Sequence, residues 1–352
     1  MPHEEFPDNF LPGAVFDQPD PRDKEVDMSE MGMSTGPLPA EFSVLKAPLN
    51  YKVNKTGAFN QGYIGTCMTN AVAQLYLYEL QRQGVQYADY VPSRLFLYYV
   101  ARYGAVKNTW PIVPSAKFYD ALRQPGILPQ GDQSAQLKDS GSSARDVIKI
   151  MRALGAPPED ASIKDHQVGS GKWPYDAEVQ PNNGLFKPND WPARLPDPEC
   201  FRAAVLHQAL GYARPGEGSA ECWKRCIQRG YPIVFSCKLY DSWWQWGNGA
   251  SWGKPNNSIW PIPRPGEGYG KDKDHPGRRH ALVAVGWDDN KRAPGTSSAG
   301  AFYVQNSWGP TWGENGFSWM PYEWLAFNDN EQYWPWAVES PWTFMQSGKQ
   351  KN

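Results

Sequence analysis

The sequence lacks the features that mark membrane-spanning, secreted and nucleic-acid-binding proteins. No apolar run approaches the ~20 residues that a membrane-spanning helix needs, and the amino terminus has neither the basic nor the apolar region of a signal peptide. The 35 Lys and Arg residues nearly balance the 37 Asp and Glu residues, and no extended basic tract occurs. We therefore expect no membrane association and no nucleic-acid partner.

Cysteine is also scarce. The chain has five in 352 residues: Cys67, Cys200, Cys222, Cys226 and Cys237. Without a signal peptide, this favours reduced thiols and a location inside a cell or packaged in a particle, with secretion as the alternative. Cys222 and Cys226, with Cys237 and His207 in the same region, raise the question of a metal site, but their spacing suits one helix face better than a zinc knuckle. We expect no metal and no organic cofactor.

Glycine, proline and tryptophan are abundant, at 33, 33 and 17 residues, which favours ordered loops on a rigid frame over a helical bundle. Apolar periodicity and capping residues predict helices in the first part of the chain, and short apolar runs predict strands after about residue 230. The predicted helices cover 67–81, 93–102, 143–154, 199–210 and 219–228; the predicted strands cover 231–237, 280–287, 301–305 and 316–320.

This segregation of helices and strands predicts an α+β protein with two lobes and a cleft between them. We divide the chain into an acidic, Pro-rich extension (1–37), a mainly helical lobe (38–230), a mainly β lobe (231–340) and a tail (341–352). Trp243 to Trp246 open a large insertion. We interpret its tryptophans as packing residues, with an added rim of the cleft as the alternative.

Cys67 follows a glycine-containing loop and stands in the first turn of the predicted 67–81 helix. Unpaired backbone N–H groups and the helix dipole favour an anion there. The position therefore predicts a lowered thiol pKa and a thiolate nucleophile. The alternative is a buried cysteine that only fills space in the core.

Two further stretches favour the nucleophile. His280 begins a predicted strand, and Asn306 ends the next one. Thiol, imidazole and carboxamide form a Cys-His-Asn site, in which the imidazole takes the thiol proton and the carboxamide orients the ring. We interpret the other histidines as structural or solvent-exposed: His3, His166, His207 and His275.

Three motifs around these residues resemble, in the same order, those of the papain-like cysteine peptidases, and they span residues 61–316. In the family they run Gln-Gly-x-x-Gly-Ser-Cys, then a His heading a small-residue strand, then Asn-Ser-Trp-Gly-x-x-Trp-Gly-x-x-Gly. The matching residues are Gln61, Gly62, Gly65, Thr66 and Cys67; His280, Ala281, Val283, Val285 and Gly286; and Asn306, Ser307, Trp308, Gly309, Trp312, Gly313 and Gly316. The resemblance is closer to microbial and viral branches than to lysosomal cathepsins.

The resemblance implies a papain-like two-lobe fold and a monomer that hydrolyses peptide bonds in proteins or peptides through a thioester acyl-enzyme. It implies Cys67 as nucleophile, His280 as base and Asn306 as the group that orients the imidazole. The Gln61 side chain and the Cys67 backbone N–H would form the oxyanion hole. Trp308 would cover the bond between His280 and Asn306.

The resemblance also implies that Gly141 and Ser142 bind the backbone of an extended substrate. Departures from the family pattern lie nearby. Ile64 and Asp139 stand where the family has the two halves of a disulfide, and Met68 replaces an aromatic residue. Cys67 and His280 are separated by far more than the ~130–150 residues typical of papain-type enzymes, which indicates large insertions.

Residues 1–37 are rich in Pro, Asp and Glu, with only Arg22 and Lys24 as basic residues. This composition predicts a disordered tail. The sharper hypothesis is a short extended pro-segment that lies across the cleft and contacts Arg278 and Arg279. The leading prediction for the chain is thus an endopeptidase inhibited by its own N-terminal segment. The alternatives are an exopeptidase, if an insertion or the tail blocks one end of the cleft, and a catalytically silent structural or binding protein.

Overall fold

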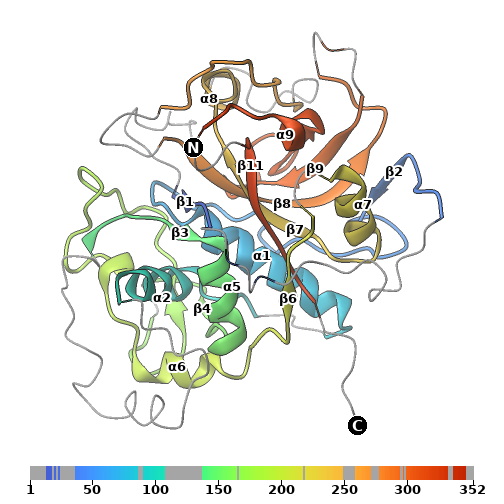
Figure 1. Cartoon of the computed structure of the whole chain (residues 1–352). Helices are drawn as coiled ribbons and strands as arrows, with labels where there is room; N and C mark the ends of the chain where they lie inside the picture. Colours follow the sequence, from blue (N-terminus) through green and yellow to red (C-terminus); the bar gives the residue numbers. More distant parts are fainter. Residues whose placement is uncertain are drawn as a thin grey trace.

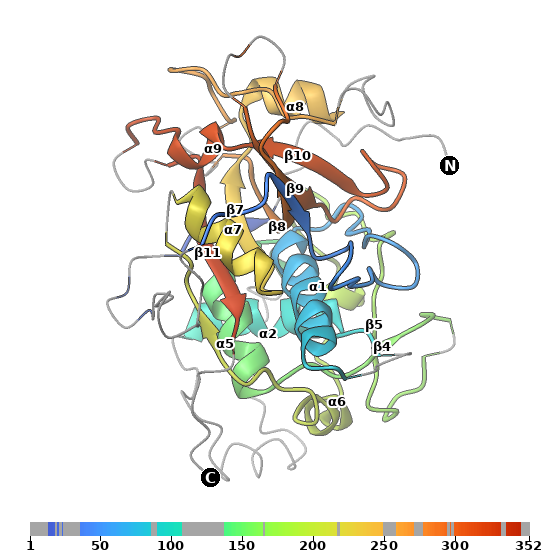
Figure 2. The same cartoon turned by 90° about the vertical axis from the view of Figure 1, so that its right-hand side faces the viewer.

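The computed structural model describes residues 13–17, 20, 23, 36–85, 90–107, 137–164, 166–216, 219–248, 258–270, 277–293, 296, 299–331 and 336–345. The fold is α+β with the two predicted lobes. Helices α2, α5 and α6 gather in one lobe, and strands β7 to β10 with helices α7, α8 and α9 form the other (Figures 1 and 2). Helix α1 (Cys67–Arg82) lies between the two groups. Within the described ranges no helix is both long enough and apolar enough to cross a bilayer.

Helix α1 is buried from Cys67 to Leu80, because apolar and small residues surround its axis and leave no polar face. Helix α2 (Arg94–Lys107) begins after Ser93, whose hydroxyl accepts a hydrogen bond from Phe96 N at 3.2 Å. Helix α5 (Ala144–Ala153) begins after Ser143, which caps Asp146 N in the same way.

Helix α6 (Pro198–Ala204) is shorter than the predicted 199–210. Gly155 ends the preceding helix at a φ of +77°, and a Cβ there would lie 2.1 Å from the Ala204 carbonyl oxygen. The chain after Ala204 therefore turns against Gly155, and Ala209 N donates to Met151 O at 2.9 Å. Bonds to α5 replace the last helical turns that the sequence pattern predicted.

The β lobe is built on a seven-stranded sheet in the order β10-β9-β8-β7-β11-β6, with β2 paired to β8. All its pairings are antiparallel. The strands are β2 (Glu41–Ser43), β6 (Tyr212–Ala213), β7 (Ile233–Lys238), β8 (Arg279–Asp288), β9 (Ala301–Gln305), β10 (Phe317–Pro321) and β11 (Val338–Phe344). Helices α7 (Ala220–Gln228), α8 (Asp241–Asn248) and α9 (Glu323–Ala326) lie in the same lobe.

Shorter elements complete the described chain. They are β1 (Ala14–Val15), which pairs with β3 (Ser142–Ser143), then β4 (Glu159–Asp160), which pairs with β5 (Trp173–Pro174), and the 3-10 turn η1 (Trp191–Ala193). Strand β1 belongs to the predicted structureless extension. It lies within residues 13–17, which contact β3 of the helical lobe and Arg279 of β8.

Two predicted boundaries are corrected. The tail was predicted to begin at residue 341, but β11 runs through Phe344 and is fully buried between β7 and β6. Its apolar residues, Trp342 and Phe344 among them, are part of the core. Residues 346–352 lie outside the described part. Helix α7, assigned to the helical lobe, packs on β7 and β8 because Trp223 and Ile227 bury its apolar face there.

The tryptophans of the 243–246 stretch pack against the core, as the packing interpretation predicted: Trp243 is buried, and Trp244 and Trp246 are partly buried. This stretch is part of helix α8, and the Trp243 side chain has no exposed surface. Its ring lies 5.3 Å from that of Trp260 and 5.6 Å from that of Trp308, both edge-on. Within the insertion, residues 249–257 and 271–276 lie outside the described residues.

Trp223 tests how the core holds α7. Its ring is fully buried, 5.1 Å from Phe235 and 5.3 Å from Phe302. We expect Trp223→Ala to lower the free energy of unfolding by ~3–5 kcal/mol in urea titrations, through lost apolar burial and the cavity left behind. The matched control, Trp336→Ala at a residue that is 39% exposed, should cost less than about 1 kcal/mol. Equal losses would contradict this account of the core.

Candidate active site

The packing of α1 against β8 brings Cys67 to the strand that carries His280. Cys67 is the first residue of α1, and His280 is the second residue of β8, opposite Cys237 of β7. The Cys67 thiol contacts the backbone of Ala281, the neighbour of His280. Both side chains are fully buried.

Asn306, just after β9, holds the other side of the imidazole. His280 Nε2 lies 2.7 Å from Asn306 Oδ1, which also accepts from Ser307 N at 2.7 Å. His280 Nδ1 has no hydrogen-bond partner among the described groups. The Trp308 ring lies 4.9 Å from the imidazole and is tilted by 36° to it.

Burial controls the charges in this arrangement. Desolvation raises the pKa of the Cys67 thiol to about 12, against backbone hydrogen bonds that lower it. Desolvation also lowers the pKa of His280 to about 4, against the bond to Asn306 that raises it. The lowered thiol pKa predicted from the helix terminus is therefore wrong for this form, because loss of water outweighs the helix N–H groups. Both groups are neutral at neutral pH.

The chain's own N-terminal segment lies against this site. Strand β1 pairs in parallel with β3, Ser142 N donates to Gly13 O at 2.9 Å, and Gly13 bridges to Arg279. Gly13 lies against Gly65 on one side, where an added Cβ would meet the Gly65 carbonyl oxygen at 2.1 Å. On the other side, a Cβ added to Gly141 would lie 2.0 Å from the Gly13 carbonyl oxygen.

The predicted substrate-binding residues, Gly141 and Ser142, thus bind an extended backbone, that of residues 13–15. Gly141 adopts a φ of +70°, which a side chain disfavours, and this turn aims the Ser142 N–H at Gly13. The segment also contacts the Cys67 thiol through the Gly13 backbone.

Residues after β1 anchor the segment. Phe16 is 2% exposed, and the Arg279 guanidinium lies 4.4 Å above its ring. Asp17 accepts from Trp342 Nε1 at 2.7 Å and from Arg145 N, in the first turn of α5, at 3.0 Å. The anion thus lies at a helix N-terminus, where backbone N–H groups stabilise it.

Acidic contacts of the segment differ from the predicted ones. Asp23 forms ion pairs with Arg145 and Arg214, whereas Arg278 pairs with Asp241. Arg279 contacts the segment through the Phe16 ring and through its backbone bridge to Gly13. The remaining residues of the extension lie outside the described part.

Gln61 lies in the loop before Cys67 and is fully buried. Its Oε1 accepts from Ser307 Oγ at 2.7 Å, and its Nε2 donates to Ile64 O at 2.9 Å. The side chain is thereby held in the loop that ends at the nucleophile, with one further N–H on the same nitrogen. The contact with Ser307 joins the first and third sequence motifs.

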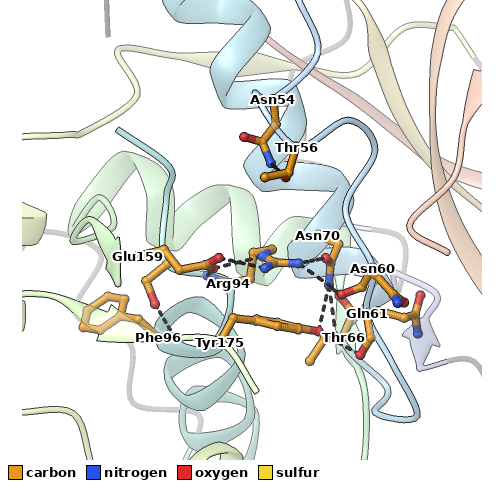
Figure 3. A network of polar contacts seen from close by, with 11 residues as sticks. Asn54, Thr56, Asn60, Gln61, Thr66, Asn70, Arg94, Phe96, Glu159 and Tyr175 are labelled. Carbon is orange, nitrogen blue, oxygen red and sulfur yellow. Dashed lines mark hydrogen bonds and ion pairs between the residues drawn. The ribbon is translucent and has the colours of Figure 1, made fainter. Parts of the chain in front are cut away.

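A buried polar network holds this loop in place (Figure 3). Tyr175 OH donates to Gln61 O at 3.0 Å, and Asn70 Nδ2 donates to Thr66 O at 2.9 Å. Arg94 Nη1 donates to Asn70 Oδ1 at 2.7 Å, so the guanidinium orients the amide that holds the loop.

An ion pair and an aromatic ring hold the Arg94 side chain in place. Its guanidinium binds both carboxylate oxygens of Glu159 at 2.7 and 2.9 Å and lies 3.5 Å from the Tyr175 ring centroid. Sequence analysis missed this network, because its members are separated by long stretches of chain and no motif links them. A buried arginine one residue after a helix cap was the only available signal.

The other chemically suggestive residues do not join the site. His166 Nδ1 lies 2.6 Å from Asp160 Oδ2, and His207 stacks on Tyr90. All five cysteines are free thiols. No trio of His, Cys, Asp or Glu side chains within the described ranges is arranged to hold a metal ion.

Arg94→Met tests the network. Removing the cation leaves Glu159 buried and unpaired, which typically costs ~3–5 kcal/mol of stability. We expect a loss of that size in urea unfolding. Arg202→Met is the control, because Arg202 and Glu199 are 58% and 38% exposed and such pairs contribute about 0–1 kcal/mol. A small effect at Arg94 would show that water reaches the network.

Comparison with known proteins agrees with this geometry. The sequence matches the family described as Papain family cysteine protease over residues 267–327, around His280 and Asn306. An uncharacterized peptidase C1-like protein of Acanthamoeba polyphaga mimivirus is 24% identical over 328 residues, covering 89% of this chain and 82% of the viral protein.

Solved structures share the fold. Xylellain, a cysteine protease from Xylella fastidiosa, superposes with a TM-score of 0.65 at 24% identity, covering 95% of this chain and 96% of xylellain. Digestive procathepsin L2 from the Tenebrio molitor larval midgut gives 0.54 at 14% identity, covering 96% and 78%. The cysteine protease and lectin-like domains of Cwp84 from Clostridium difficile give 0.51 at 19% identity, covering 92% of this chain and 53% of that one.

These structural likenesses speak to the fold alone. The family match and the viral relative make this chain similar to the papain-like C1 peptidases. A peptidase implies protein or peptide substrates.

Proposed function

We propose that this protein is a cysteine endopeptidase that its own N-terminal segment keeps inactive. The observation that carries the proposal is the Cys67 thiol beside the Ala281 backbone, with His280 bound to Asn306 at 2.7 Å. No metal or organic cofactor is required for this chemistry.

In the proposed reaction, His280 takes the Cys67 proton and the sulfur attacks the peptide carbonyl carbon. The oxyanion is stabilised by Gln61 Nε2 and the Cys67 backbone N–H. The protonated imidazole then gives its proton to the leaving amine, and a thioester to Cys67 remains. A water molecule, deprotonated by His280, hydrolyses the thioester. Asn306 keeps the imidazole in one orientation, and Trp308 shields their bond.

The proposed inhibition follows from the position of β1. Gly13 occupies the space between Gly65 and Gly141, and its carbonyl takes the Ser142 N–H that an extended substrate would use. The same segment dries the site, so the thiol and the imidazole stay uncharged. Its departure would readmit water, lower the thiol pKa and raise the imidazole pKa, which favours the reactive ion pair.

Gly13→Leu tests the inhibition in the full-length chain. A leucine Cβ would overlap the Gly65 carbonyl oxygen, so the segment should leave the site. We expect cleavage of a peptide library to rise about 10-fold or more, as for a shifted two-state equilibrium. Val15→Ala, at a residue that is 40% exposed, is the matched control and should stay near wild type.

Gly13→Leu combined with Cys67→Ala sets the background of this assay. Activity that survives in the combined variant would exclude Cys67 as the nucleophile. End-labelled peptides in the same assay separate endopeptidase from exopeptidase cleavage. If no variant cleaves peptides and an epoxide inhibitor of thiol peptidases leaves Cys67 unmodified in Gly13→Leu, the catalytically silent alternative holds.

Alkylation of Cys67 by iodoacetamide provides a second test, because only the thiolate reacts. The thiol ionises above its pKa of about 12 and the imidazole is protonated below about 4, so the covered pair is neutral between these values. We expect slow modification of the wild type from pH 5 to 9, measured by mass spectrometry, and fast modification of Gly13→Leu at neutral pH. Partly exposed Cys222 serves as the internal reference. Equal Cys67 rates would contradict burial by the segment.

A further inference from the structure

A partly buried carboxylate joins the two loops that hold Gly13. Asp139 lies just before β3, and its two oxygens accept from Gly65 N at 3.1 and 3.0 Å. Gly65 is two residues before the nucleophile. The carboxylate therefore fixes the backbone of the loop that ends at Cys67.

Tyr98 of α2 extends this connection to the second loop. Its hydroxyl donates to Asp139 Oδ1 and accepts from Gly141 N at 3.2 Å. One continuous chain of hydrogen bonds thus runs from Gly65 through Asp139 and Tyr98 to Gly141. We call these two side chains the Asp139–Tyr98 clamp.

The clamp rests on a buried arginine. Arg102, one turn after Tyr98, lies with its guanidinium carbon 4.2 Å from the Tyr98 ring centroid. Its guanidinium also donates to Lys138 O at 2.9 Å and to Pro192 O. Asp139 N donates to Gly184 O at 2.8 Å, so the acidic residue is held at its backbone as well.

The position of the clamp gives it a function. Gly65 and Gly141 are the two backbone points that enclose Gly13, as the two Cβ overlaps show. The distance between them decides whether an extended peptide backbone fits. Ile64 and Asp139 also stand where the papain-like motifs place the halves of a disulfide, and here both cysteines are absent.

We propose that Asp139, with Tyr98, is a positioning residue that sets the spacing between the nucleophile loop and the substrate-binding loop, in place of a disulfide. The inference rests on the proposed function for its role toward substrate. Its effect on the bound N-terminal segment does not depend on catalysis.

Two substitutions test the connections of the clamp to Gly65 and to Gly141 separately. In Asp139→Asn, one carboxylate oxygen becomes an NH₂ group, which cannot accept from Gly65 N. Tyr98→Phe removes the link to Gly141 and leaves both bonds to Gly65. The control is Asp329→Asn in the β lobe, a carboxylate that also accepts from a tyrosine, Tyr240 OH at 2.9 Å. Asp329 also pairs with buried Lys238 at 2.7 Å, so this variant reports what loss of a buried polar contact away from the clamp does to Cys67.

The first readout is alkylation of Cys67 in the full-length chain with Gly13 in place. We expect iodoacetamide modification to rise about 10-fold in Asp139→Asn and in Tyr98→Phe, because a hydrogen bond that involves a charged group is lost. The double variant should exceed the stronger single variant only slightly, since both act in one chain of bonds. Asp329→Asn should match wild type.

The second readout is peptide cleavage in the Gly13→Leu background. Asp139→Asn should raise KM about 10-fold and change kcat little, because the clamp holds the substrate backbone and not the reacting atoms. If alkylation rises but no variant cleaves peptides, the proposed function fails and the positioning role stands.

Unchanged alkylation in both clamp variants would overturn the inference. So would an equal rise in Asp329→Asn, because that would indicate general loosening. If Asp139→Asn does not fold, Tyr98→Phe carries the same test, with its unfolding midpoint measured beside that of wild type. A fall in kcat with unchanged KM would also count against a positioning role.

Discussion

The site depends on the packing of a helix without a polar face against a strand that is buried along almost its whole length. Helix α1 is buried from Cys67 to Leu80, and β8 is buried from Arg279 to Trp287. Neither element can turn away without exposing apolar surface, so the start of one stays beside the start of the other. This constraint places the Cys67 thiol against the Ala281 backbone, next to His280, and every later feature of the site depends on it.

Much of this arrangement was predictable, for reasons that lie in particular residues. Ser93, Ser143 and Ser219 mark helix starts within one residue, because their hydroxyls accept from the first-turn N–H groups. The three motifs correctly predicted the fold, and the bond between His280 and Asn306 lies where the third motif implied. The roles of Cys67, His280 and Asn306 in catalysis stay predictions.

What the sequence did not predict arises from contacts between distant segments. Helix α6 ends early because the residues after Ala204 pack closely against the backbone at Gly155. Nothing in the sequence of 205–210 itself indicates this contact. Strand β11 looked like a tail because its partners, β7 and β6, lie more than a hundred residues earlier. The thiol pKa was predicted from the helix terminus alone, whereas burial of the thiol raises it against the backbone contacts that lower it.

Gly13 has a further consequence for what this surface accepts. The absence of a single carbon atom lets the covering segment run between Gly65 and Gly141. A peptide that followed the same track would need glycine at that one place, and a random sequence seldom offers it. A substrate without glycine at this place must therefore bind along a different path, or the backbones at Gly65 and Gly141 must first move apart. The close approach of the chain at this residue therefore favours its own segment over a peptide that carries a side chain at the same place.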